Sequence, residues 1–289
     1  MRVALVVNLH REDAIEAARE AARWLFEHAQ VEVVAEDHVA GKLEIQSAPK
    51  EELALCDLVI AFGGDGTIIR AAHICSEQGT PILGVHFGRF GFVTQCTPDE
   101  IGAALSAFVD GEHVVERRMM LQTDLIRGDH TVATIHTLNE SILQRIITDR
   151  MLTFGVEVNG HHLTSYPADG VMVSTPTGST GYNLSAGGPV VDPTVEALIL
   201  VALAPHTLSA RPLLLRADSV VRLRLDTGGD AVLSGDGQTR LHLLPGDYVE
   251  IRRSTRTTNL VTIQNEDFLH KLRDRLFWSQ SIIGKDLEQ

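Results

Sequence analysis

The sequence predicts two domains of different fold class: an α/β domain with a mostly parallel sheet over residues 1–113, and an all-β, layered or sandwich-like domain over residues 114–266. In the first part, continuous apolar runs alternate with segments of helical periodicity, which is typical of parallel strands covered by helices. In the second part, short apolar runs follow one another between turn residues. Residues 267–289 return to a helical pattern, and a lone terminal helix needs a surface to pack on.

The first part is expected to begin with a strand over residues 3–8 and a helix over residues 12–28. Apolar side chains recur on one face of that helix at Ile15, Ala18, Ala22, Leu25 and Phe26. Further buried, parallel strands are expected at residues 31–36, 57–62 and 81–85. Thr97, followed by Pro98 and by Glu100 three residues later, predicts the start of another helix.

In the second part, residues 154–163 read as a hairpin with Asn159-Gly160 at its turn. A second hairpin is expected from residues 220–226 and 231–237, with Gly228-Gly229 between them. Residues 247–254 and 259–264 continue the strand pattern. The terminal helix carries apolar side chains at helical spacing, namely Phe268, Leu269, Leu272, Leu276 and Phe277.

Composition narrows the class of protein. Hydrophobic residues make up 44% of the 289 positions and charged residues 22%, which is normal for a protein with a real core. The apolar runs are too short for a membrane span or a signal peptide, and the three cysteines lack a CxxC spacing, so a reducing cytoplasm is expected. The net charge of −13 disfavours nucleic acid and anionic membranes as partners, but a small anion can still bind to backbone N–H groups.

A glycine-rich turn follows the predicted strand that ends at Phe62. Gly63-Gly64-Asp65-Gly66-Thr67 then opens a helix, at the end of a parallel strand where open α/β sheets bind ligands. The glycines let phosphates approach the backbone. Asp65 would repel a phosphate unless it holds a metal or takes a proton from an attacking hydroxyl; the alternative is an aspartate that caps the helix.

Two polar side chains, Asn139 and Glu140, interrupt the apolar run of residues 135–143. A buried glutamate is costly unless it is paired or hydrogen-bonded, so recognition of ribose hydroxyls or of a base edge is one interpretation. The other is a strand edge with an exposed glutamate.

Residues 173–189, "VSTPTGSTGYNLSAGGP", contain no charged side chain. The stretch offers neutral hydrogen-bonding groups at Thr177, Ser179, Thr180, Tyr182, Asn183 and Ser185. Its glycines, Gly178, Gly181, Gly187 and Gly188, allow a close approach of the backbone. A surface loop is possible, but the set suits adenine edges and ribose hydroxyls, with phosphate held elsewhere.

Together these motifs resemble the NAD kinase family. Their order is GGDGT, NE, the long block of residues 169–189, then PHTLSARP and DGQ, and the likeness covers nearly the whole chain. GGDGT alone is weak, because diacylglycerol and sphingosine kinases carry similar loops and phosphofructokinases a related one. The block of residues 169–189 is far more specific.

The resemblance implies phosphoryl transfer to the 2′-hydroxyl of the adenosine ribose of NAD. The implied donor is ATP or polyphosphate with a divalent metal, expected to be magnesium. A homodimer or homotetramer is implied, and residues 267–289 would return to the first domain and complete it. A lipid kinase of the diacylglycerol or sphingosine type and a non-catalytic dinucleotide sensor are the alternatives.

Site residues follow from the resemblance position by position, with no metal ligand among them. Asp65 matches the proposed catalytic base. The implied binding residues are Gly63, Gly64, Gly66, Thr67, Asn139, Glu140, Arg150, Asp169, Thr177, Thr180, Gly181, Tyr182, Asn183, Leu184, Ser185 and Gln238. Within this set, Asn139 and Glu140 match contacts to adenosine, and Asp169 a contact to the nicotinamide half. Four positions depart from the family pattern: Gly181, His86 and Phe90, where Ala, Asn and Leu are common, and Pro167, where some relatives have Arg.

Overall fold

The computed structural model describes residues 1–87, 91–93, 96–146, 151–263 and 268–275. The chain forms two compact units, which confirms the predicted fold class. The first unit comprises Met1–Ala71, Thr80–Glu116 and Leu260–Gln289, and the second comprises Ala72–Gly79 and Arg117–Asn259. Three elements cross between these ranges: helix α4, strand β6 and strand β17.

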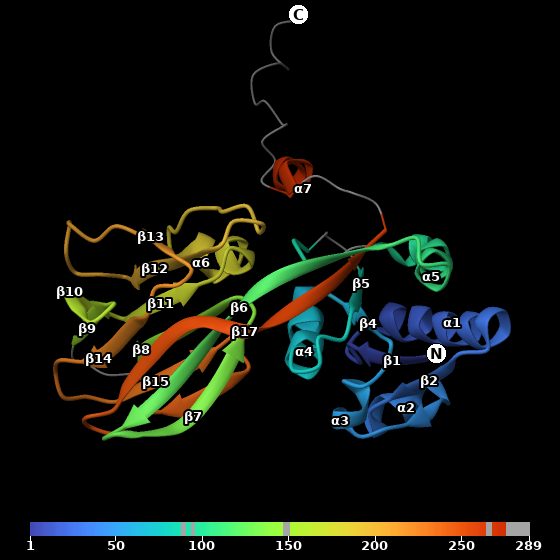
Figure 1. Ribbon diagram of the computed structural model, residues 1–289, viewed down its shortest axis with the longest axis horizontal. Helices are drawn as coiled ribbons and strands as arrows, with labels where there is room; N and C mark the ends of the chain where they lie inside the picture. Colours follow the sequence, from blue (N-terminus) through green and yellow to red (C-terminus); the bar gives the residue numbers. More distant parts are fainter. Residues whose placement is uncertain (88–90, 94–95, 147–150, 264–267, 276–289) are drawn as a thin grey trace, which may run out of the picture. The chain divides into compact units, whose positions relative to one another are not determined.

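The first unit is built on a parallel sheet with the strand order β3-β2-β1-β4-β5. Figure 1 labels β1, β2, β4 and β5 of this sheet. Its strands are β1 (Arg2–Val7), β2 (Glu32–Ala35), β3 (Gln46–Ser47), β4 (Leu58–Gly63) and β5 (Ile82–His86). Its helices are α1 (Glu12–Ala29), α2 (Asp37–Leu43), α3 (Lys50–Leu53), α4 (Asp65–Cys75), the 3-10 turn η1 (Pro98–Glu100) and α5 (Ile101–Val109). The last residues of β17 extend this sheet through the parallel pair Leu260 and Ile82.

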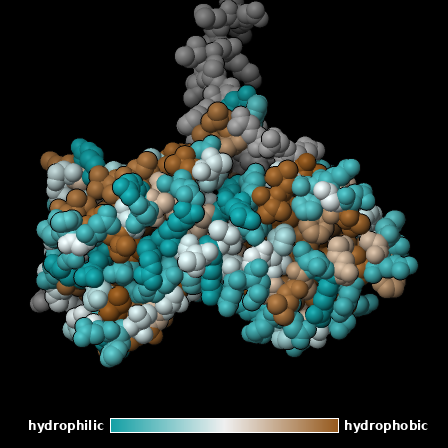
Figure 2. Space-filling view, in the orientation of Figure 1, coloured by the Kyte–Doolittle hydropathy of each residue, from teal (hydrophilic) through white to brown (hydrophobic). Residues whose placement is uncertain are grey.

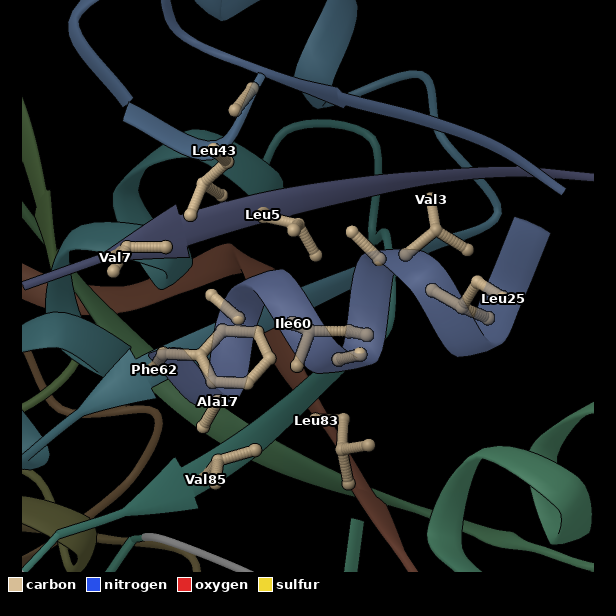
Figure 3. Packing of buried hydrophobic residues seen from close by; sticks show 14 of the residues in the cluster. Val3, Leu5, Val7, Ala17, Leu25, Leu43, Ile60, Phe62, Leu83 and Val85 are labelled. Atoms are coloured by element: carbon tan, nitrogen blue, oxygen red, sulfur yellow. The ribbon is translucent and has the colours of Figure 1, made fainter. Parts of the chain in front are cut away.

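The core of this unit forms where α1 lies on the sheet. Its small residues let the helix approach closely, so that Ala17 lies beside Phe62 of β4 and Leu25 near Val3 of β1 (Figure 3). All residues of β4 and β5 are buried, as expected for parallel strands covered on both faces. The predicted capping box before η1 is present, since the Glu100 carboxylate accepts the N–H of Thr97 at 2.8 Å.

The prediction for Phe26 is wrong. Its side chain is 72% exposed, whereas Leu25 beside it is buried, because the apolar stripe of α1 is narrow and made mainly of alanines. Large hydrophobic side chains are also exposed elsewhere, and Figure 2 shows hydrophobic residues interspersed among hydrophilic ones on the face in view. Single exposed apolar side chains of this kind are normal on a protein surface.

The second unit is a two-layer β structure. Its first sheet is antiparallel, with the order β13-β12-β11-β8-β15-β16. Those strands are β8 (Glu140–Arg145), β11 (Gly170–Ser174), β12 (Ala197–Leu203), β13 (Leu213–Arg216), β15 (Ala231–Gly235) and β16 (Thr239–His242). The second layer runs β10-β9-β14-β17, with β6 pairing to β17 and β7. Its strands are β6 (Val114–Arg127), β7 (His130–Thr137), β9 (Leu152–Val158), β10 (His161–Ala168), β14 (Val221–Leu225) and β17 (Tyr248–Thr262).

Side chains from the two layers share one apolar cluster, in which Leu143 and Val171 of the first sheet pack with Phe154 and Leu223 of the second. The connection between β11 and β12 contains the 3-10 turn η2 (Thr177–Thr180) and the short helix α6 (Tyr182–Ser185). The hairpin at Asn159-Gly160 is confirmed: β9 and β10 are antiparallel, and both turn residues have positive φ, 52° and 77°.

One prediction about strand connections is wrong. Strands β14 and β15 do not form a hairpin, since β14 pairs with β9 and β17 whereas β15 pairs with β8 and β16 in the other sheet. The strand pattern of residues 247–254 and 259–264 is confirmed, and one long strand, β17, covers most of both segments. The apolar pattern gives strand positions, but it cannot tell which layer a strand joins.

The last described element is helix α7 (Phe268–Arg275). It confirms a helix at this place; Leu272 is buried and Leu269 is 63% exposed, while Leu276 and Phe277 lie outside the described residues. No helix in the described part of the chain is long and apolar enough to cross a membrane.

The three cysteine thiols are buried, at Cys56, Cys75 and Cys96. Burial raises the pKa of Cys56 to about 11 and that of Cys96 to about 12.

Candidate nucleotide site

The glycine-rich turn lies where the sequence predicts it. Strand β4 ends at Gly63 and helix α4 begins at Asp65. A Cβ atom on Gly63 would overlap the Thr67 hydroxyl, so packing within the turn requires glycine there. Around Gly64 and Gly66 nothing lies within 4 Å of an added Cβ, and both residues are exposed. This exposed backbone at a helix N-terminus is suited to bind an anion.

Asp65 is half-buried and its carboxylate is oriented by a second segment of the same unit. The carboxylate accepts the N–H of Phe92 at 3.0 Å and that of Val93 at 3.3 Å. Gly91 lies so close that a Cβ on it would overlap the Asp65 carboxylate. The side chain therefore has a defined direction and remains partly accessible, as a proton acceptor requires.

In the second unit, Asn139 and Glu140 lie at the junction of β7 and β8. The exposed strand-edge interpretation of Glu140 is wrong, because its side chain lies in the interior with only 7% of the residue exposed. Burial, reinforced by the nearby charge of Asp236, raises the pKa of Glu140 to about 8. Glu140 is therefore a largely neutral carboxylic acid at pH 7.

Asp236 organises this junction. It lies at the turn between β15 and β16 with φ 49°, and its side chain is fully buried. Its Oδ1 accepts the N–H of Asn139 at 2.8 Å and that of Glu140 at 3.1 Å, and its Oδ2 accepts the N–H of Leu138 at 2.8 Å. The Nε2 atom of His73 lies 2.7 Å from the same Oδ2. The aspartate thus satisfies three consecutive backbone donors.

The uncharged loop after β11 packs directly on Asn139. Thr175 donates its N–H to the Asn139 carbonyl at 2.8 Å and its hydroxyl to the Leu138 carbonyl at 2.6 Å. The Thr175 hydroxyl oxygen accepts the N–H of Gly178 at 3.0 Å. A Cβ on Gly178 would overlap the Asn139 carbonyl, so this close approach is possible only for glycine.

Part of the neutral hydrogen-bonding capacity of the loop is used to fold the loop itself. The Ser179 hydroxyl donates to the Val191 carbonyl and accepts the Val191 N–H, and Asn183 donates its amide to the carbonyls of Ser179 and Pro189. Asn183 is fully buried. These two side chains, which the sequence suggested as ligand groups, have at least one structural role each.

Other polar atoms of this region are buried and have no hydrogen-bond partner among the described residues. They are Asn139 Oδ1, Glu140 Oε2, Thr177 Oγ1 and Asn183 Oδ1. Two of these residues lie beside the same glycine, because a Cβ on Gly181 would lie 3.7 Å from Asn139 Nδ2 and 3.8 Å from Glu140 Oε2. Buried polar atoms without partners are costly and are usually satisfied by a ligand or by water.

A pocket of about 480 Å³ opens beside this cluster within the same unit. Asp169 and Arg145 line it and form an ion pair with Nε to Oδ1 at 2.9 Å. The remaining lining residues are Gln144, Tyr182, Ser185, Ala186, Leu203 and Ala204. Tyr182 is 47% exposed, so its ring is available to a ligand.

The other predicted site residues are placed as follows. Thr180 donates its hydroxyl to the Thr177 carbonyl, Leu184 is half-buried in α6, and Gln238 is exposed on the β15–β16 turn. Arg150 and Phe90 lie outside the described residues. His86 is buried at the end of β5, and the Pro167 carbonyl accepts the N–H of His206. The glycine-rich turn Gly63–Thr67 belongs to the first unit. Asn139, Glu140 and the loop of residues 173–189 belong to the second.

Sequence reasoning missed Asp236 and His73. The motif at residues 236–238 suggested only Gln238, although an Asp-Gly pair between strand-like runs already indicates a turn with an aspartate in it. His73 lies eight residues after Asp65 in a helical pattern, and nothing in the sequence pairs it with a residue more than 160 positions away.

Comparisons with known proteins show the family of the chain. Residues 3–113 match the model of the ATP-NAD kinase N-terminal domain, and residues 138–263 that of the ATP-NAD kinase C-terminal domain. The NAD kinase of Geobacter metallireducens is 38% identical over 281 residues, covering 96% of this chain and 99% of its own. That of Thermoanaerobacter sp. strain X514 is 36% identical over 279 residues, covering 95% and 98%.

Two solved structures share the fold over nearly the whole chain. Yeast NADH kinase complexed with NADH superposes with a TM-score of 0.93 at 25% identity, covering 99% of this chain and 90% of its own. An NAD kinase from Archaeoglobus fulgidus in complex with ATP gives a TM-score of 0.77 at 27% identity, with coverages of 96% and 99%. With both halves matched and relatives above 30% identity along its length, the chain belongs to the ATP-NAD kinase family, whose reaction is the phosphorylation of NAD.

Proposed function

We propose that the chain transfers the terminal phosphoryl group of ATP to the 2′-hydroxyl of the adenosine ribose of NAD and so makes NADP. The observation that carries this proposal is the pair of buried side chains beside Gly181, Asn139 and Glu140, whose Oδ1 and Oε2 atoms have no hydrogen-bond partner among the described residues. Neutral donors and acceptors of this kind match a base edge and ribose hydroxyls, which carry no charge. The relatives that are NAD kinases, and the related structures with NADH and with ATP, support the same substrates.

Asn139 and Glu140 are the residues that would hold the adenosine part. A neutral Glu140 can donate a hydrogen bond through its proton and accept another, so it can serve a hydroxyl in either direction. Asp169, Tyr182 and Ser185 line the neighbouring pocket and would receive the nicotinamide half.

Asp65 would act as the base. In the proposed step the 2′-oxygen forms a bond to the γ-phosphorus, the bond from that phosphorus to the leaving oxygen breaks, and ADP departs. The proton of the hydroxyl passes to the Asp65 carboxylate, which the N–H groups of Phe92 and Val93 hold in one direction. Positioning and charge neutralisation provide most of the catalysis in such transfers.

Magnesium is the expected metal, but the described residues do not form a cage for it. No cluster of three or more His, Cys, Asp or Glu side chains suited to a metal ion lies among them. We therefore assign the ion to the phosphates of the donor, which it commonly accompanies, and assign no step to it. Use of polyphosphate as donor, a cytoplasmic location and a homo-oligomeric state stay predictions.

The two alternatives differ in acceptor. A lipid kinase would phosphorylate a lipid hydroxyl, and a sensor would bind the dinucleotide without turnover. Incubating purified protein with ATP and either NAD, diacylglycerol or no acceptor separates the three, with ATP loss as the readout. Loss that depends on NAD and yields NADP supports the proposal, while binding without turnover supports the sensor.

The role of Asp65 is tested by Asp65→Asn, which keeps the shape of the side chain and one of its two acceptor oxygens but cannot take up the proton. We expect kcat to fall by about 10²–10⁴-fold, the usual contribution of a general base. NAD binding measured by calorimetry should persist. Asp37→Asn, at the exposed first position of α2, is the matched control and should leave both quantities unchanged. A loss of less than about tenfold in kcat would return Asp65 to a structural role.

A further inference from the structure

The segment Leu138–Asn139–Glu140 carries the two side chains assigned above to the adenosine part, Asn139 and Glu140. Leu138 and Asn139 lie between strands, since β7 ends at Thr137 and β8 begins at Glu140. The three consecutive N–H groups of the segment all point to one acceptor, the carboxylate of Asp236, at distances between 2.8 and 3.1 Å. In return, the Glu140 carbonyl accepts the N–H of Asp236 at 3.1 Å. The backbone of the segment is therefore fixed by a residue more than 90 positions away.

His73 completes this arrangement. Its Nε2 atom lies 2.7 Å from Asp236 Oδ2, and its side chain is 17% exposed while that of Asp236 is fully buried. An ionised carboxylate can only accept, so His73 must present Nε2 as the donor. The aspartate then has four donors around its two oxygens, which is what a buried charge requires to be tolerated.

The backbone of Asp236 suits only a few residue types. Its φ of 49° lies in the left-handed region, where Asn and Asp are tolerated far better than most side chains. Gly237, at φ 68°, follows it in the turn. The chain adopts this costly conformation at a residue whose carboxylate accepts the backbone N–H groups of Asn139 and Glu140.

We propose that Asp236, held by His73, is a positioning residue for nucleotide binding: it fixes the Asn139–Glu140 segment so that both side chains face the adenosine part of NAD. This inference rests on the proposed function, because that function assigns Asn139 and Glu140 to the adenosine part. Neither Asp236 nor His73 needs to touch the substrate. Burial raises the pKa of Glu140 to about 8, and the nearby charge of Asp236 adds to that rise.

The decisive variant is Asp236→Asn. Asparagine tolerates the same backbone conformation, but one of its two oxygens becomes an NH2 group that faces backbone donors instead of accepting from them. We expect the KM for NAD to rise about 10- to 100-fold, since N–H groups lose their acceptor and the segment shifts. The KM for ATP and the kcat at saturating NAD should stay within about threefold of wild type.

Asp247→Asn is the matched control in the same unit. Asp247 is also buried and accepts from Arg127 and from the N–H of Leu244, but it contacts none of the site residues in the described structure. Both variants should lower the melting temperature, and only Asp236→Asn should raise the KM for NAD. Equal effects of the two variants on that KM would mean general destabilisation and would overturn the proposal.

His73 provides a second test if Asp236→Asn does not fold. His73→Leu removes the donor and should raise the KM for NAD about three- to tenfold, whereas His73→Gln keeps an N–H donor and should recover most of the affinity. An unchanged KM in His73→Leu would overturn the role of His73.

Calorimetry with NAD on the wild-type protein keeps the two proposals apart: if wild type binds no NAD, the proposed function fails. If wild type binds and a folded Asp236→Asn binds equally well, only the present inference fails.

Discussion

The buried carboxyl group of Glu140 makes the stability of the protein depend on pH in a defined direction. Its pKa rises from the ordinary 4.5 to about 8, so the folded chain holds a proton that the unfolded chain releases. More bound protons in the folded state mean that the free energy of unfolding falls as pH rises from about 4.5 to about 8. At about 1.4 kcal/mol per pH unit, the full effect is on the order of 5 kcal/mol.

Glu140→Gln removes this titration while keeping size and hydrogen-bonding capacity. The unfolding free energy of the variant minus that of wild type should therefore grow with pH, by on the order of 3–5 kcal/mol between pH 5 and pH 9. Urea unfolding followed by circular dichroism at several pH values, without nucleotide, measures this difference. Asp247→Asn is the control. The pKa of Asp247 is lowered in the folded state, so Asp247 contributes a constant amount to the free energy of unfolding between pH 5 and pH 9 and loses that contribution only in acid. A difference between Glu140→Gln and wild type that does not change with pH refutes the reasoning.

Three glycine substitutions test the close approaches in the two units. Gly91→Ala would push the Asp65 carboxylate out of place and should lower kcat by at least about tenfold with NAD binding retained, as kinetics and calorimetry would show. Gly178→Ala would overlap the Asn139 carbonyl and should cost about 1–3 kcal/mol of stability in urea unfolding, together with NAD affinity. In Gly181→Ala the added Cβ would lie 3.3 Å from its nearest neighbour, the Gly178 carbonyl oxygen, so NAD kinase activity should stay within about tenfold of wild type. A folded Gly181→Ala protein without activity would contradict this geometry.

Local patterns predicted the elements well. The strand before Gly63 and the helix that begins at Asp65 could be read from the sequence, because a continuous apolar run and a glycine-rich turn each have one common structural meaning. The hairpin at Asn159-Gly160 followed for the same reason, since both residues accept positive φ.

Features that depend on distant partners could not be predicted. The pairing of β14 with β9 and of β15 with β8 is set by how two layers share a core, and the sequence pattern of a strand is the same in either layer. Asp236 escaped notice because its partners are separated from it by more than 90 residues in one case and more than 160 in another. The burial of Glu140 was likewise undecided, since an interrupted apolar run fits both an exposed edge and a buried acid.

The buried thiols described above give the protein a set of internal reporters. A protonated thiol inside a packed core reacts with alkylating or oxidising reagents only when the surrounding structure opens. Cys56 and Cys96 lie in the first unit, whereas Cys75 lies in the second. Mass spectrometry of alkylated peptides can therefore time the opening of each unit separately, in the unmodified sequence, and NAD or ATP should slow the labelling of whichever unit each one stabilises.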